Sequence, residues 1–260
     1  MIELKNVTID YPLDLEDGAS LKSALLNVFR KNQKQSKSYY RALDNVSLRI
    51  CRGERVGLIG LNGAGKSTML RVMSGIFQPS HGAVKIVGRV SPLLDFATGL
   101  ELHHTGIENI RIRLMFLGES PKEIDRKISE IAEFSELGEF IHMPARTYSA
   151  GMFMRLAFAT STAINPEMLI ADEVVGAGDA QFAEKAKQRI EELLSGERTT
   201  VLSSHSMDLI RTFCNRVIWL HNGRIIADGQ CEEIIKDYEL RAPIIGRETG
   251  KKDECVNAYS

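Results

Sequence analysis

The segment that most constrains this chain is residues 60–68, which read GLNGAGKST and match the pattern G-x-x-x-x-G-K-[ST]. An apolar run, RVGLIG, leads into it, and residues 66–75 have the character of a helix. Glycines at this spacing let the backbone turn its N–H groups inward around a phosphate, and the helix dipole favours the same anion. A strand-to-helix turn without a ligand is the alternative, but the complete strand, loop and helix argue against it.

We therefore predict a nucleotide phosphate site in this loop. Lys66 is expected to bridge the β- and γ-phosphates, and the Ser67 hydroxyl to ligate Mg²⁺. The residues expected to contact the nucleotide here are Gly60, Asn62, Gly63, Ala64, Gly65, Lys66, Ser67 and Thr68.

A second acidic site follows a buried strand. Residues 168–173 read MLIADE, so Asp172 and Glu173 come at the carboxyl end of an apolar run. Ligands of open α/β sheets bind at that edge. We expect Asp172 to hold Mg²⁺ and Glu173 to act as the general base on the attacking water. Alone this pair is a weak signal, because carboxylates often cap strands, and its weight comes from the loop upstream.

The organisation of the chain is that of an α/β protein. Apolar strands and helices alternate from residue 43 to 94 and again from 167 onward, while residues 106–164 are mainly helical with a break at Pro144. The fold that we predict is a P-loop nucleotide-binding domain over residues 1–240, with a mixed or parallel sheet and a helical subdomain at about 97–164. Residues 241–260 are polar and aperiodic, which suggests a loose tail.

Several classes of protein are excluded by composition. The chain has 43% hydrophobic and 26% charged residues with a net charge of −1, so it is neither disordered nor globally basic for nucleic acid. Its four cysteines are scattered, which fits a reducing compartment and no zinc site. No apolar run approaches the ~20 residues of a membrane helix.

Three further motifs give the chain a family resemblance. YSAGMFMR stands at 148–155, Asp179 lies in GAGD, and His205 follows the strand TTVLSS. With the phosphate loop and MLIADE, these residues resemble the ATP-binding subunit of ABC transporters over about residues 1–240. YSAGM occupies the place of the family signature LSGGQ, Asp179 that of the D-loop aspartate, and His205 that of the switch histidine.

The resemblance implies a mechanism and partners. Two identical subunits would face each other head to tail, and Ser149 and Gly151 of one would contact the γ-phosphate held by Lys66 of the other. His205 would contact the γ-phosphate and orient the water with Glu173, and Asp179 would lie at the same interface. ATP and Mg²⁺ are the implied cofactors, and an integral membrane permease is the implied partner.

The chain departs from the family pattern at a few positions. Asp95 stands where the family has a glutamine, and we expect it to reach Mg²⁺ through oxygen without the amide's donor. Tyr11 is our choice for stacking on adenine. Tyr39 or Tyr40 can replace it, because the segment 12–41 blurs the alignment.

The form of the motifs narrows the resemblance to exporters of polysaccharide. RVSPLLDFATGLELHHTGIENI, YSAGMFMRLAFA and ADEVVGAGDAQF look like the ATPase subunits that export lipid-linked O-antigen, with capsule and teichoic acid exporters as relatives. This implies a peripheral protein on the cytoplasmic face of the bacterial inner membrane. A soluble ABC-type ATPase acting on nucleic acid or ribosomes is the alternative, but those proteins usually carry paired domains or long arms. A P-loop GTPase would need an N-K-x-D motif, which the sequence lacks.

The segment 12–41 separates the first predicted strand from the second. Leu21, Leu25, Val28 and Phe29 follow helical spacing, and six basic residues and no acid lie between Gly18 and Leu43. We expect this basic insertion to meet anionic lipid headgroups or the pyrophosphate of a lipid-linked sugar. A short helix packed on its own sheet is the nearly equal alternative.

Overall fold

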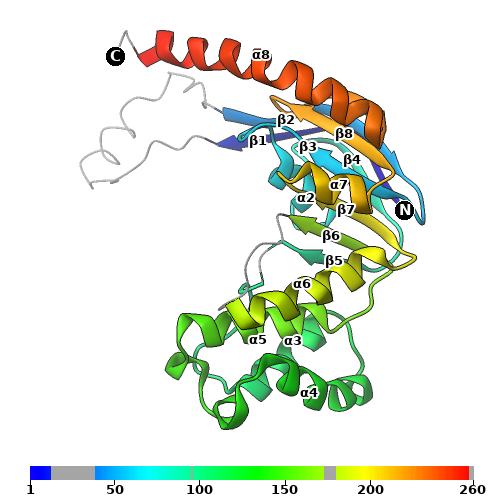
Figure 1. Ribbon diagram of the computed structural model, residues 1–260. Coiled ribbons are helices and arrows are strands. Elements are labelled where there is room, and N and C mark those ends of the chain that lie inside the picture. The colour runs from blue at the N-terminus through cyan, green and yellow to red at the C-terminus, as the bar shows by residue number, and fades with distance from the viewer. Residues whose placement is uncertain (13–38, 95, 173–179, 258–260) are drawn as a thin grey trace, which may run out of the picture.

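The computed structural model describes residues 1–12, 39–94, 96–172 and 180–257. The side chains of residues 180–181 and 246–257 are not described. Two sheets and three groups of helices make up this part of the chain (Figure 1).

The first sheet is antiparallel and has the order β2-β1-β4. Its strands are β1 (Ile2–Pro12), β2 (Tyr39–Ile50) and β4 (His81–Ile86). Alternate residues of β1, such as Ile2 and Leu4, are buried, as expected for a sheet with one face on the core. The sequence predicted strands here, but it did not predict that they form a sheet of their own.

The second sheet has the order β5-β6-β7-β3-β8-β9 and carries the predicted phosphate loop. Its strands are β3 (Arg55–Ile59), β5 (Val90–Leu93), β6 (Met168–Asp172), β7 (Thr199–Ser203), β8 (Arg216–His221) and β9 (Arg224–Gln230). All neighbouring pairs are parallel except β8 with β9. The central strands are buried along almost their whole length, which explains their continuous apolar sequences. The expected mixed sheet is confirmed.

Helix α2 (Lys66–Met73) lies between the two sheets. Met69, Leu70 and Met73 of this helix are fully buried against residues from β1, β2, β3 and β6. This core fixes the direction of the helix, and therefore the position of the loop that precedes it.

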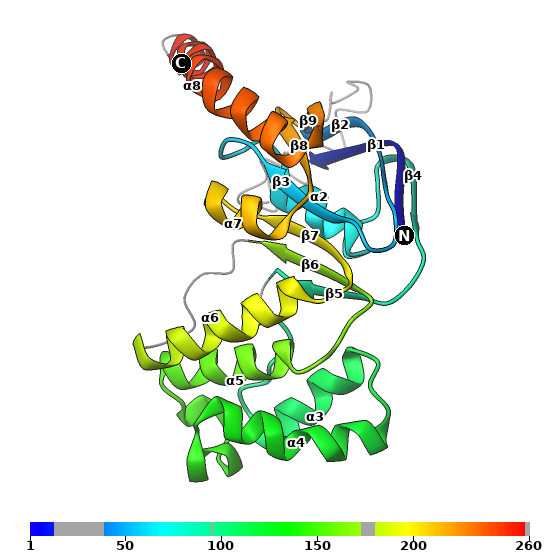
Figure 2. The ribbon, with the colours of Figure 1, turned by 45° about the vertical axis from the view of Figure 1, so that its right-hand side comes forward.

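The other face of the large sheet is covered by helices α6 (Ala180–Ser195), α7 (Met207–Phe213) and α8 (Cys231–Asn257). Phe158, Phe182 and Trp219 are the largest buried side chains of this second core. Figure 2 shows α8 at the opposite end of the molecule from the helices of residues 106–162.

The expectation of a loose tail after residue 240 is wrong for residues 241–257, which continue α8 past Pro243. Proline removes one backbone hydrogen bond from a helix, so the continuation needs support from packing. Ala242 is buried and Ile245 packs against the second core, while the guanidinium carbon of Arg241 lies 5.2 Å from the Trp219 ring centre. These contacts stabilise the helix on both sides of the proline.

The helical region predicted at 106–164 consists of α3 (Gly106–Phe116), α4 (Pro121–Ser135), η1 (Gly138–His142), η2 (Ala145–Thr147) and α5 (Ala150–Thr162). Its caps are local. Thr105 and Glu108 form a capping box, and Ser120 caps α4 ahead of Pro121. A third core, with Ile110, Ile131 and Leu156 among its members, holds these helices together. The predicted break at Pro144 is confirmed.

Backbone pairing and ion pairs hold the end of β1 against the start of β2. Pro12 is the register partner of Tyr39, and Tyr11 that of Tyr40. Arg41 donates from Nε to Asp10 at 2.8 Å and pairs with Asp44, which also pairs with Arg224 of β9. The hydrogen bond from Arg224 holds the pKa of Asp44 below its ordinary range. We call Asp10, Arg41, Asp44 and Arg224 the hairpin clamp.

Within the described residues, no helix is both long and apolar enough to span a bilayer.

Candidate functional site

The phosphate loop requires glycine at two positions for reasons that the structure makes explicit. Gly60 has a φ of 152°, and a Cβ there would lie 2.3 Å from the carbonyl oxygen of Leu220. Gly65 has a φ of 102°, and a Cβ there would lie 2.6 Å from the carbonyl oxygen of Ala42. Both the left-handed backbone and the close approach exclude side chains. The loop is therefore held against β8 and β2 in one shape.

Lys66 closes this loop from inside. Its side chain is buried, and Nζ donates to the carbonyl of Gly60 at 2.8 Å and to that of Leu61 at 3.2 Å. Helix α2 begins at Lys66 with Gly65 as its N-cap, and no side chain caps it. The amino end of the helix dipole and the buried ammonium of Lys66 therefore lie at the same loop, and both favour an anion. This is the local chemistry of a phosphate site.

A hollow of about 240 Å³ surrounds the loop, and we call it the nucleotide hollow. It is lined by Tyr40, Ala42, Asn62, Gly63, Ala64, Gly65, Lys66, Ser67, Thr68, Asp172, Ser203 and His205. Asp172 and Ser203 are register partners at the carboxyl ends of β6 and β7. The structure therefore brings the predicted Asp172 and His205 to the predicted loop, along one edge of the parallel sheet.

The donor set of the hollow fits a magnesium-bound nucleotide. The Ser67 hydroxyl and the Asp172 carboxylate are hard oxygen ligands, and both line the hollow. No group of three or more His, Cys, Asp or Glu that could hold a metal ion occurs in the described part of the chain. Magnesium bound with substrate phosphates usually has only one or two protein ligands, so this sparse set is suitable for it.

The structure separates the three candidate tyrosines. Tyr11 packs on the first core, with its ring 6.0 Å from that of Phe77 and its hydroxyl 3.4 Å from Oγ1 of Thr68. Tyr40 is half exposed and lines the nucleotide hollow, whereas Tyr39 is equally exposed and does not. Tyr11, the choice made from sequence, is thus a partly buried packing residue at this edge.

Ser149 and Gly151 begin a helix elsewhere in the chain. The Ser149 side chain accepts from the backbone N–H of Met152 at 3.2 Å and caps α5, and a Cβ on Gly151 would approach only Ser149 Oγ, at 3.9 Å. Neither residue lines the described nucleotide hollow, and both views show α5 among the other helices, away from α2 (Figures 1 and 2). One chain does not bring the signature to its own phosphate loop.

Three predicted site residues lie outside the described residues: Asp95, Glu173 and Asp179. Conversely, Ser203 and Ala42 line the hollow and were not predicted. A signal for Ser203 exists in the sequence, because TTVLSS is an apolar strand whose polar end reaches the same edge as MLIADE. The approach of Ala42 depends on the hairpin register, which the sequence does not reveal.

Comparisons with known proteins agree with this geometry. A model of the ABC transporter family matches residues 43–176. The O-antigen export system ATP-binding protein RfbE of Yersinia enterocolitica is 42% identical over 225 residues, covering 85% of this chain and 94% of the relative. The teichoic acids export ATP-binding protein TagH of Staphylococcus epidermidis is 37% identical, covering 92% of this chain and 88% of the relative.

A solved structure extends the likeness to three dimensions. The ATP-binding cassette MJ0796, in a dimeric post-hydrolysis state bound to ADP and Pi, superposes with a TM-score of 0.64 at 26% identity, over 89% of this chain and 99% of that one. A phosphate loop, an acidic strand end and a capped signature helix occur here in the order the family requires. The chain belongs to the ABC transporter family, as one of its ATP-binding subunits.

Proposed function

We propose that this protein is the ATP-hydrolysing subunit of an exporter for lipid-linked polysaccharide, with O-antigen as the first candidate. The observation that carries the proposal is the nucleotide hollow, where Lys66, Asp172 and His205 converge in a chain 42% identical to an O-antigen export protein. Capsule and teichoic acid are the related substrates, since a teichoic acid export protein is 37% identical.

The residues divide the chemistry among them. The loop N–H groups and Lys66 hold the phosphates, while Ser67 and Asp172 hold Mg²⁺, which neutralises charge on the transferred phosphoryl group when the nucleotide is bound. His205 follows β7 and reaches the hollow, where it orients the attacking water at the γ-phosphate. The sequence assigns proton abstraction from that water to Glu173, the residue after Asp172. Asp95, which lies outside the described residues, remains an expected oxygen ligand of Mg²⁺.

Tyr40 replaces Tyr11 as our proposed adenine platform. An aromatic ring that stacks on a base must present one open face to it. Tyr40 is 50% exposed and lines the hollow. The ring of Tyr11 meets Phe77 edge to face, so its surroundings are those of a packing residue.

A complete site requires two copies of the chain. Ser149 and Gly151 expose a capped helix start that favours an anion, but they lie apart from the loop of their own chain. In the proposed homodimer they contact the γ-phosphate held by Lys66 of the partner, and Asp179 lies at the same interface. The similar cassette of known structure is dimeric, which supports this arrangement.

The proposed permease surface lies between α3 and the large sheet. A mostly apolar hollow of about 480 Å³ there is lined by residues that include Ile76, Leu94 and Phe116. Phe116 is 81% exposed, and Met115 and Leu102 nearby on the chain are also exposed. An exposed apolar cluster of this kind marks an interaction site. We assign it to a cytoplasmic segment of the permease, which would place the ATPase at the inner face of the bacterial inner membrane.

The basic insertion, residues 12–41, is proposed to serve export and not ATP chemistry. The hairpin clamp lies where this segment leaves and rejoins the sheet that carries Tyr40. Near an anionic surface each Lys or Arg contributes ~1 kcal/mol, so several basic residues act together. Replacing Arg30, Lys31 and Lys34 by Gln should abolish surface polysaccharide while ATP hydrolysis and assembly persist. Unchanged polysaccharide would leave packing as the role of the segment.

The first test of the proposal separates binding from hydrolysis. Glu173→Gln retains size but removes the base, a role worth ~10²–10⁴-fold in rate, so turnover should collapse while ATP still binds and locks a dimer. Near-normal turnover would contradict the assignment.

The second test addresses the shared site. A mixture of Lys66→Ala and Gly151→Asp subunits should recover activity, because each heterodimer contains one complete site. Failure of the mixture, with a rate strictly proportional to protein concentration, would argue against signature residues acting on the partner's nucleotide.

The third test addresses the exported substrate. Deletion of the gene in its native host should leave lipid-linked polysaccharide inside the cell, and the intact gene should restore export. Normal surface polysaccharide in the deletion strain would refute the proposed transport role, but it would not contradict the assignment of the protein as an ATPase.

A further inference from the structure

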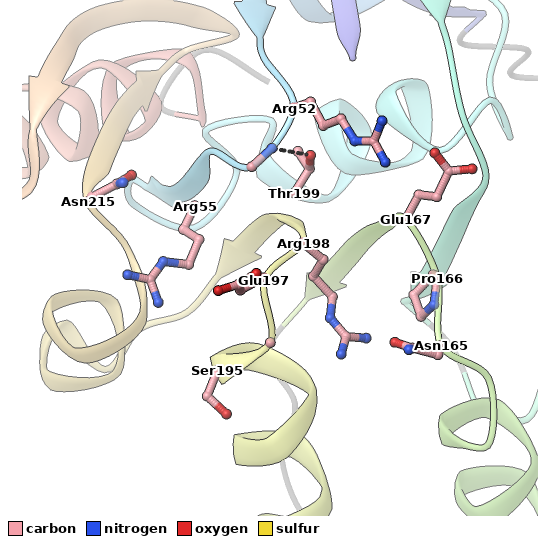
Figure 3. Close-up of a pocket in the computed structure, with 12 residues that line it drawn as sticks. Arg52, Arg55, Asn165, Pro166, Glu167, Ser195, Glu197, Arg198, Thr199 and Asn215 are labelled. Carbon is pink, nitrogen blue, oxygen red and sulfur yellow. Dashed lines mark hydrogen bonds between the residues drawn. The ribbon is translucent and has the colours of Figure 1, made fainter.

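A second hollow, of about 900 Å³, opens at the edge of the large sheet opposite the nucleotide hollow (Figure 3). Arg55 and Thr199 are the first residues of β3 and β7, and Glu167 directly precedes β6. Because these strands are parallel, their amino ends meet here and their carboxyl ends meet at the phosphate loop. We call this site the basal hollow. None of its lining residues takes part in the proposed ATP chemistry.

Its walls carry three arginines from two connections that are far apart in the sequence. Arg52 lies between β2 and β3, Arg55 begins β3, and Arg198 precedes β7. None of the three makes an ion pair with another residue in the described part of the chain. An arginine that folds beside a hollow without a carboxylate partner is available to an external anion.

Two carboxylates, Glu167 and Glu197, lie at the rim of the same hollow. Glu167 turns one oxygen to the backbone N–H of Arg89, which donates to it at 3.4 Å. Glu197 is exposed to solvent. Figure 3 shows both carboxylates directed away from the Arg198 guanidinium. Three cations against two acids leave a net positive hollow, with the acids at its margin.

The strongest evidence for a ligand comes from Arg198. Its Nη1 is buried and has no hydrogen-bond partner among the described residues, and burial lowers the pKa of the guanidinium. Figure 3 shows the group directed into the hollow beside Asn165. A buried donor without an acceptor is costly, and an oxyanion that turns the guanidinium toward itself removes that cost.

Gly196 makes this position of Arg198 possible. A Cβ on Gly196 would lie 2.4 Å from Nη2 and 2.7 Å from Nε of Arg198, so any side chain there would displace the guanidinium. The backbone N–H of Arg198 donates to the Gly196 carbonyl at 2.8 Å, which fixes the turn. The sequence thus places glycine where the arginine must fold back.

We propose that the basal hollow binds a small oxyanion with two or more negative charges, held by Arg198 at the centre and by Arg52 and Arg55 from the rim. Its volume is large enough for a ligand with several phosphate or carboxylate groups. Such a ligand would join the starts of β3, β6 and β7, the strands that end at the phosphate loop, Asp172 and His205.

The test is isothermal titration of the full chain with pyrophosphate in the absence of Mg²⁺. The wild type should bind two pyrophosphates, one at the phosphate loop and one in the basal hollow. Lys66→Ala should retain the basal site, and Arg198→Gln should retain the loop site while its basal dissociation constant rises at least about tenfold. Citrate, titrated separately, distinguishes a site for phosphate alone from one that also accepts carboxylates.

Two further variants make the result specific. Gly196→Ala keeps every charge but displaces Arg198, so it should weaken the basal site as well. Arg126→Gln removes one charge from an exposed side chain on α4 and should change nothing. If Arg198→Gln does not fold, Arg55→Gln takes its place. Wild-type basal binding in Arg198→Gln or Arg55→Gln, or equal weakening in Arg126→Gln, would overturn the proposal. One pyrophosphate per wild-type chain would also overturn it, whatever the outcome for the ATP site.

Discussion

Truncation of Tyr40 isolates the part of nucleotide affinity that comes from stacking. Tyr39 and Tyr40 are adjacent, and their side chains are 52% and 50% exposed, yet only Tyr40 lines the nucleotide hollow. Neighbouring strand residues point to opposite faces, which accounts for the difference. The pair Tyr39→Ala and Tyr40→Ala therefore makes the same chemical change at equal exposure, once inside the site and once outside it.

The magnitude follows from what each ring contacts. Base–aromatic stacking is worth ~1–3 kcal/mol per base, so Tyr40→Ala should raise the dissociation constant for ATP about 5- to 150-fold. Tyr40→Phe keeps the ring and should bind ATP like the wild type. Tyr11 packs against Phe77 and the first core, so Tyr11→Ala should instead lower the free energy of unfolding by ~2 kcal/mol or more.

The assay is equilibrium binding of a fluorescent ATP analogue, paired with denaturant unfolding of each variant. Tyr39→Ala should change neither quantity appreciably. The reasoning is refuted if Tyr40→Ala binds like the wild type. It is refuted equally if Tyr11→Ala loses affinity at unchanged stability, because Tyr11 would then be the adenine platform.

Further predictions follow from other contacts. Lys66→Ala removes a buried ammonium from the loop, and since a hydrogen bond to a charged group contributes ~1.5–3 kcal/mol, calorimetry should show ATP binding weakened about 10- to 150-fold. Ser149→Ala loses the cap on Met152 N–H and should lower the free energy of unfolding by ~1 kcal/mol, whereas Ser149→Asp should retain most of it; equal losses would contradict the capping role. Phe116→Ser changes an 81% exposed side chain, so stability should stay within ~0.5 kcal/mol while co-purification with the permease fails. The pKa of Asp44 lies below its ordinary value of 3.8 because of Arg224, so its ion pairs stabilise the fold above that pH and are lost as pH falls through the lowered pKa; the Tm difference between the wild type and Asp44→Asn should therefore shrink below about pH 4.

Local sequence was sufficient for the elements that are buried on both faces or sharply capped. β3 and β6 are short apolar runs that end at Ile59 and Asp172, as the sequence predicted. The phosphate loop was predictable because its chemistry is contained in one contiguous segment. The convergence of Lys66, Asp172 and His205 was predictable because parallel strands share one functional edge.

The features that sequence could not predict depend on register and on tertiary packing. Tyr11 and Tyr40 are cross-strand partners, and only the three-dimensional arrangement shows which ring lies on the core and which on the hollow. Helix α8 passes Pro243 because Ala242 and Ile245 pack against the core, an interaction that no local pattern contains. The basal hollow is likewise assembled from turns that are far apart in the chain.

The pairing of strands beside the hairpin clamp determines how the segment between β1 and β2 is attached to the fold. The backbone positions Pro12 and Tyr39 are paired across the strands, so the chain leaves and re-enters the sheet at neighbouring points, about 4.5–5.5 Å apart between Cα atoms. Residues 13–38 are therefore inserted between two paired strand positions. We expect that a short turn could replace them without disturbing β1, β2 or the phosphate loop. Exchange of this segment for that of a relative would therefore test its proposed role in export without changing the residues of the nucleotide hollow.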